Sequence, residues 1–104
     1  MGKQHPELKE KFDTQTAEEV REPTQYKILM HNDHFTTMDF VVHILETVFN
    51  KPPSEAVRIM LNIHKNGVGV CGIYTAEVAE TKIETVHFLA RQNGFPLKCS
   101  MEEV

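Results

Sequence analysis

The sequence has no excess of basic residues, no long apolar run and only two cysteines. Eleven Lys and Arg residues stand against fifteen Asp and Glu residues, which gives a formal net charge of -4, so no basic field indicates a nucleic-acid partner. The apolar stretches are far shorter than the roughly 20 residues that a membrane-spanning helix needs, and the N-terminus lacks the apolar stretch of a secretory signal peptide. The Met-Gly start suggests myristoylation, but Pro6 stands where that motif has Ser or Thr. Two cysteines, Cys71 and Cys99, are a weak basis for a disulfide framework, so we expect a cytoplasmic protein with reduced thiols.

The 104 residues suffice for one domain and divide into two parts of different composition. Residues 1–24 are rich in Glu and Lys and contain few apolar side chains. Such a segment cannot bury enough surface to offset its ordering entropy. We therefore predict a mobile N-terminal tail over residues 1–24 and a folded domain over residues 25–104.

The folded part shows the periodicities of three strands and three helices. Helices are predicted over residues 38–50, 54–65 and 76–93, and strands over residues 26–31, 68–75 and 97–101. Thr36 and Asp39 have the spacing of a variant capping box, and Gly67 and Gly94 suit helix C-caps. The order β-α-α-β-α-β predicts an α+β fold, a two-layer sandwich of a three-stranded antiparallel sheet with three helices on one face.

A polar segment, MHNDHFTTMDF, lies between the first strand and the first helix. His31 and His34, with His64 as a third ligand, could form a small metal site, although nothing in their spacing requires one. Asn32 and Asp33 could simply form an Asx-turn between strand and helix. They could also supply acceptors for an ammonium group beside an apolar hollow.

The remaining chemically notable side chains have ordinary structural interpretations. Cys71 is expected to be a small buried thiol rather than a nucleophile, because no orienting group or oxyanion site accompanies it. His43 and His87 are expected on solvated helix faces, and Met38 and Met60 in the core or beside a pocket.

Three segments together resemble the ClpS adaptor family: YKILMHNDHFTTMDFVVHILETVF, AVRIMLNIHKNGVGVCGIYTAEVAETK and HFLARQNGFPLKCSMEE. The resemblance runs from about Tyr26 to Glu103. It implies an adaptor without enzymatic activity and without a cofactor. Such an adaptor binds N-degron substrates, which begin with Leu, Phe, Tyr or Trp, and delivers them to the ATP-dependent ClpA-ClpP protease.

The resemblance also implies roles for particular residues. The substrate's α-amino group would be bound by Asn32, Asp33, His34 and His64. The first side chain would enter a hydrophobic pocket, with Met38 as a gate against β-branched residues, formed by Thr36, Met38, Val41, Met60, Ile63 and Leu97. Docking to the N-terminal domain of a ClpA-type unfoldase would use Glu77, Glu80 and Lys82, and the tail would be the handle that enters the unfoldase pore.

Two positions depart from the family pattern. The family usually has an acidic residue where this chain has His34, and Pro where it has Thr37. Losing a carboxylate beside an ammonium should weaken the attraction, although a neutral imidazole still accepts one hydrogen bond. Because of His34, an alternative is an adaptor that accepts fewer kinds of N-terminal residue than other ClpS adaptors do.

Histidine differs from aspartate in gaining charge near neutral pH. We predict that peptide affinity falls more steeply below about pH 6.5 than in a His34→Asp variant, because a cationic imidazole repels the substrate's ammonium. Affinity is to be measured at about pH 8 and about pH 6. His64 is common to both proteins, so equal pH profiles would contradict a role for His34.

Overall fold

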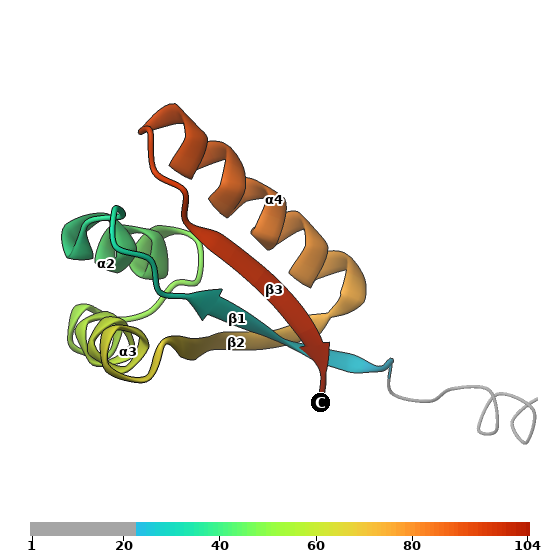
Figure 1. Ribbon diagram of the computed structural model, residues 1–104. Coiled ribbons are helices and arrows are strands. Elements are labelled where there is room, and N and C mark those ends of the chain that lie inside the picture. The colour runs from blue at the N-terminus through green and yellow to red at the C-terminus, as the bar shows by residue number, and fades with distance from the viewer. Residues whose placement is uncertain (1–22) are drawn as a thin grey trace, which may run out of the picture.

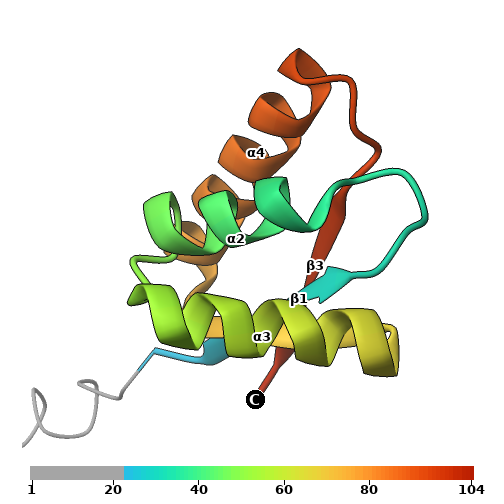
Figure 2. The same ribbon diagram turned by 90° about the vertical axis from the view of Figure 1, so that its left-hand side faces the viewer.

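The computed structural model describes residues 23–104, and most of the predicted tail lies outside this range. Its elements are β1 (Gln25–His31), α2 (Met38–Thr47), α3 (Pro53–Asn66), β2 (Val68–Thr75), α4 (Ala76–Gln92) and β3 (Lys98–Glu103). The strands form an antiparallel sheet in the order β2-β1-β3. Figures 1 and 2 show α2 and α3 lying together beside one end of the sheet, with α4 crossing above it. The predicted α+β sandwich with the order β-α-α-β-α-β is therefore confirmed.

The strand sequences alternate because one face of the sheet is buried under the helices. Ile28 and Met30 of β1 have no exposed surface, and Cys71 of β2 and Cys99 of β3 are buried on the same side. α4 contacts all three strands, α3 contacts β2, and α2 packs against α3. The core therefore lies between the sheet and the helices, and Leu97 extends it at the end of β3 nearest the polar loop.

A β-bulge interrupts the pairing of β1 with β2. Ile28 pairs with Gly72 whereas Leu29 pairs with Val70, so Cys71 is the extra residue of β2. The thiol is free and buried, and burial raises its pKa, with the charge of Cys99 adding to the effect. Burial likewise raises the pKa of Cys99 to about 12. Both cysteines are inert core side chains in this fold, as the sequence predicted for Cys71.

Two local predictions about helices are wrong. The N-cap of α2 is Thr37, whose hydroxyl accepts a hydrogen bond from Phe40 N at 3.1 Å, rather than Thr36. His87 is half-buried rather than fully solvated, because its Nε2 accepts a hydrogen bond from Cys99 N at 3.0 Å and so joins α4 to the edge of β3. His43, by contrast, is exposed as predicted.

Within residues 23–104, no helix is both long and apolar enough to cross a membrane.

Candidate binding pocket

The polar loop between β1 and α2 is a turn organised by Asp33. One carboxylate oxygen, Oδ1, accepts hydrogen bonds from Phe35 N at 2.8 Å and from Thr36 N at 2.6 Å. The other, Oδ2, accepts a hydrogen bond from the Thr36 hydroxyl at 2.8 Å. This is the Asx-turn that the sequence allowed, and it fixes the loop without excluding a ligand.

The same contacts determine the charge of the loop. Burial raises the pKa of the Asp33 carboxyl, but the hydrogen bonds from Thr36 and Phe35 and the nearby His34 outweigh it, so the pKa lies below its ordinary value. Asp33 is therefore ionised at neutral pH, and it carries the formal negative charge of the loop.

Both ends of the loop are tied to helices. Asn32 N donates to the carbonyl oxygen of Gly67 at 2.9 Å, and Gly67 is the left-handed C-cap of α3, with φ 87°. At the other end Thr37 caps α2. The loop thus holds the start of α2 and the end of α3 at a fixed separation, and the space between them is the pocket.

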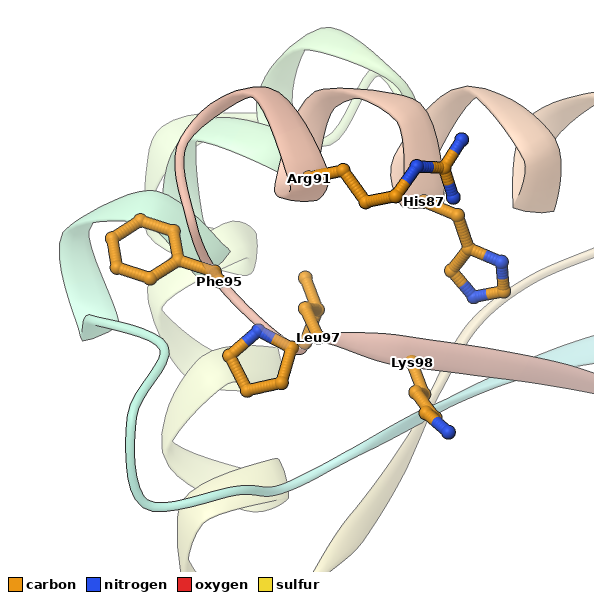
Figure 3. A pocket seen from close by; sticks show the side chains of 6 residues that line it. His87, Arg91, Phe95, Leu97 and Lys98 are labelled. Atoms are coloured by element: carbon orange, nitrogen blue, oxygen red, sulfur yellow. The ribbon is translucent and has the colours of Figure 1, made fainter.

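The pocket has a volume of about 230 Å³. Nine of the ten residues that the sequence suggested for amine binding or for the hydrophobic pocket line it: Asn32, Asp33, His34, Thr36, Met38, Val41, Met60, Ile63 and His64. The tenth, Leu97, does not line it. Leu97 is buried at the start of β3 and lines a separate hollow of about 340 Å³ beside α4 (Figure 3).

Burial divides the pocket lining into an apolar floor and a polar rim. Val41, Met60 and Ile63 form the floor and are at most 9% exposed, since they also belong to the core. Asn32, His34 and His64 are exposed and form the rim. Met38 is 45% exposed and stands at the entrance. A floor of core side chains below a rim of acceptors suits an amphipathic ligand with one polar end.

The metal hypothesis fails on geometry. Among residues 23–104, no group of three or more His, Cys, Asp or Glu side chains is placed to hold a metal ion. His31 lies outside the pocket lining, and its Nε2 hydrogen-bonds the Ser100 hydroxyl across the sheet at 2.7 Å. It is therefore separate from His34 and His64, which both line the pocket.

The three residues suggested for docking lie in the first half of α4. Glu77 and Glu80 are exposed. Lys82 is half-buried: its Nζ donates to the carbonyl oxygen of Val48 at 2.7 Å, and lies 5.1 Å from the centroid of the Tyr74 ring. Val48 is the C-cap of α2. Lys82 therefore provides a hydrogen-bond donor to a carbonyl oxygen at the end of α2, and it also contributes to the α4 surface.

One contributor to the pocket was not found from sequence. Gly69 of β2 lies behind Ile63, and a Cβ at Gly69 would lie only 2.6 Å from Ile63 Cγ1. Glycine inside a strand is a signal of close approach by another group. The sequence did not show that the approaching group, Ile63, would be part of the pocket floor.

Comparison with known proteins gives one consistent family. The family model described as ATP-dependent Clp protease adaptor protein ClpS matches residues 21–100. The chain is 60% identical over 87 residues to the ATP-dependent Clp protease adapter protein ClpS of Syntrophus aciditrophicus, covering 84% of this chain and 81% of that one. It is 52% identical over 103 residues to the ClpS protein of Desulforapulum autotrophicum, covering 99% of both chains.

A solved structure agrees with these sequence matches. Agrobacterium tumefaciens ClpS2, bound to L-phenylalaninamide, superposes with a TM-score of 0.77 and 31% sequence identity, covering 80% of this chain and all of that one. Its match to the fold, together with the family model and the close relatives, leads to one conclusion. The chain belongs to the ClpS family and is an adaptor of a Clp protease rather than an enzyme.

Proposed function

We propose that this adaptor binds N-degrons in the pocket between the loop and α3, and delivers them to a ClpA-type unfoldase. The N-degron would contribute a free α-amino group and a large hydrophobic first side chain. The observation that carries the proposal is the division of one pocket into an apolar floor and a rim of acceptors. The ligand in the ClpS2 structure, L-phenylalaninamide, has the same two parts, an ammonium and an apolar ring.

The rim supplies what an ammonium needs. An ammonium has three donors and loses free energy on desolvation unless several acceptors meet it. The Asn32 side-chain oxygen, from the loop, and a ring nitrogen of His64, from α3, are acceptors at the same pocket, and ionised Asp33 adds a negative charge. Because Asn32 is positioned through its backbone N–H, its side chain remains available to a ligand.

The floor accounts for the choice of side chain. A pocket of about 230 Å³ is smaller than the roughly 300–1,000 Å³ of drug-sized sites and suits a single amino-acid side chain. Met38 at the entrance would disfavour branching at Cβ, since a branched side chain is widest where it enters. Of the three floor residues, Met60 is the most flexible, and its thioether adapts to apolar groups of different shape.

Delivery would use the first half of α4. Glu77, Val78, Thr81 and Lys82 line a shallow hollow, and Val78 is 43% exposed. We infer that this surface binds the N-terminal domain of a ClpA-type unfoldase, with Glu77 and Glu80 as its accessible charges. Lys82 is a poor site for testing docking, because removing its ammonium also removes a hydrogen bond to the end of α2.

The first test is recognition of the amino group. Short peptides beginning with Phe, Leu, Ile or Met are compared free and N-acetylated. Acetylation should reduce affinity by roughly 100-fold or more, because it removes the charge and two or more charged hydrogen bonds. The Asn32→Ala substitution should reduce the affinity for the free peptides by roughly 10- to 100-fold. The matched control is Asn62→Ala, an exposed asparagine outside the pocket lining. Binding that survives acetylation would contradict the proposal.

The second test is the position of Ile63. In Gly69→Ala, the new Cβ would lie 2.6 Å from Ile63 Cγ1, whereas ordinary contact requires 3.4 Å or more. Ile63 must therefore move away from β2, and the space open to it is the pocket that it lines. We expect Phe-initiated peptides to lose roughly tenfold or more in affinity relative to smaller Leu-initiated ones. The control is Gly72→Ala in the same strand, whose Cβ would instead meet the Tyr74 ring.

Both glycine variants should lose stability by about 1–3 kcal/mol through overpacking, as measured by denaturant unfolding. Only Gly69→Ala should change the Phe-to-Leu ratio. An equal change of this ratio in Gly72→Ala would show that the effect comes from general loosening of the fold.

The third test is docking. Glu77→Arg should weaken binding to a ClpA-type N-terminal domain by tenfold or more in calorimetry, because a charge reversal at an interface introduces like-charge repulsion. Glu84→Arg, an exposed acid of α4 outside this hollow, is the control. Equal losses in the two variants would assign the effect to net charge.

A further inference from the structure

The backbone torsion φ of Gly67 lies at the junction between α3, which carries His64, and the loop that carries Asn32. Gly67 ends α3 in a left-handed conformation, with φ 87°. His64 lies three residues earlier, in the last turn of α3, and Asn32 directly follows β1. Figure 2 shows the chain leaving β1 on the side of the molecule where α3 ends. The junction therefore lies between two residues of the pocket rim.

The two backbone groups of Gly67 bind on opposite sides of this torsion. Its N–H donates to the carbonyl oxygen of Ile63 at 2.8 Å, and this bond fixes it to α3. Its carbonyl oxygen accepts the hydrogen bond from Asn32 N at 2.9 Å, and this bond fixes it to the loop. The next residue, Val68, pairs with His31 at the end of β1. Because φ is the rotation about the bond between the amide nitrogen and Cα, a change of φ at Gly67 moves Asn32 relative to the end of α3.

Asn32 depends on this connection more than the floor of the pocket does. Its side chain is exposed, and its backbone is placed by the hydrogen bond to Gly67. The floor residues Val41, Met60 and Ile63 are at most 9% exposed and are held by the packing of the core. A rotation at Gly67 would therefore displace the Asn32 acceptor and leave the floor in place.

The position requires glycine for its backbone conformation and not for lack of space. Beyond its neighbours in the chain, a Cβ at Gly67 would meet no heavy atom within 4 Å. The left-handed region is unfavourable for alanine and for most other residues with a Cβ, whereas asparagine adopts it more readily. Alanine therefore favours a return of φ to negative values, and asparagine keeps the observed conformation.

We propose that Gly67 is a positioning residue for recognition of the substrate's α-amino group. Its left-handed conformation holds the Asn32 side-chain oxygen and a ring nitrogen of His64 where both can accept hydrogen bonds from one ammonium. The proposal rests on the proposed function, because it concerns how the same pocket binds an N-degron. It assigns discrimination in favour of a free amino group to Gly67, and discrimination among first side chains to Gly69.

The test compares the wild-type protein with Gly67→Ala by fluorescence anisotropy, using peptides that begin with Phe or Leu, each free and N-acetylated. The affinity for the free Phe peptide should fall roughly tenfold or more, because a charge-assisted hydrogen bond to the ammonium is weakened. The preference for the free over the acetylated peptide should fall by the same factor. The Phe-to-Leu ratio should stay within about twofold of its wild-type value, since the floor remains in place.

Gly94→Ala is the matched control. Gly94 is also left-handed, with φ 76°, a Cβ there would likewise meet nothing within 4 Å, and it lies after α4, outside the pocket lining. Both alanine variants should lower the denaturant midpoint of unfolding by similar amounts, because both place alanine in a left-handed conformation. Only Gly67→Ala should lose peptide affinity. Gly67→Asn should bind the free Phe peptide within about twofold of the wild-type protein, because asparagine tolerates positive φ.

Hydrogen exchange at the Asn32 amide tests the same connection without a peptide. This amide donates to Gly67, so it should be protected in the wild-type protein, in Gly67→Asn and in Gly94→Ala. It should exchange roughly tenfold faster or more in Gly67→Ala, where local opening breaks the hydrogen bond.

The outcomes separate the role of Gly67 from N-degron binding itself. A wild-type protein that binds free and acetylated peptides equally would overturn the proposed function and the role of Gly67 with it. A wild-type preference for the free peptide that is unchanged in Gly67→Ala would overturn only the role of Gly67. Equal losses of affinity in Gly67→Ala and Gly94→Ala, or a Gly67→Asn variant as weak as Gly67→Ala, would overturn it by assigning the loss to general destabilisation. Equal exchange of the Asn32 amide in the wild-type protein and Gly67→Ala would overturn it as well.

Discussion

The hydrogen bond from Asn32 N to the carbonyl oxygen of Gly67 is the contact on which the binding pocket depends. It joins the first residue after β1 to the residue that ends α3, and so ties together the two elements that carry Asn32 and His64. Gly67 can accept it because its left-handed conformation, with φ 87°, turns the chain out of the helix. Asp33 then shapes the rest of the loop with three hydrogen bonds. The acceptors of the rim are therefore preorganised before any ligand arrives, which lowers the entropic penalty of binding.

The pocket and the core share the same side chains. Val41, Met60 and Ile63 belong to the hydrophobic core and also form the floor. This sharing explains why a glycine in β2 matters for the size of the pocket. Ile63 can lie back toward the sheet only where β2 has no Cβ, so Gly69 leaves room on the ligand side. Close packing transmits such displacements, since there is little free space to absorb them.

The two ends of α4 differ in character. The first half presents Glu77, Glu80 and the exposed Val78, and it is the surface proposed for docking. The last turns present His87 and Arg91 beside the basic start of β3. No residue of α4 lines the pocket proposed for substrate, so the surface proposed for the unfoldase uses different residues. Both partners could then be held at once without competing for the same residues.

Several features could be predicted from the sequence because they depend on short-range patterns. The alternation of Ile28 and Met30 gave β1, and Gly67 gave the end of α3. The family motif gave nine of the residues that converge on one pocket. Where prediction failed, the deciding partner was distant in sequence or competed locally. Thr36 does not cap α2 because its hydroxyl donates to Asp33, which leaves the cap to Thr37. His87 is half-buried instead of fully solvated because Cys99, twelve residues later, donates to it.

The sequence by itself thus determined the order of the elements, the apolar side of each one and the residue types available for binding, since these follow from periodicity, capping and composition. Only the tertiary structure decided which of these residues meet. It placed Leu97 in the core beside α4 instead of in the pocket. It also set His31 apart from the two histidines that line the pocket. The physical reason is that these contacts between distant residues depend on strand register, on the bulge at Cys71 and on the separation between two helices. These quantities are fixed by packing across the whole domain and not by any local segment.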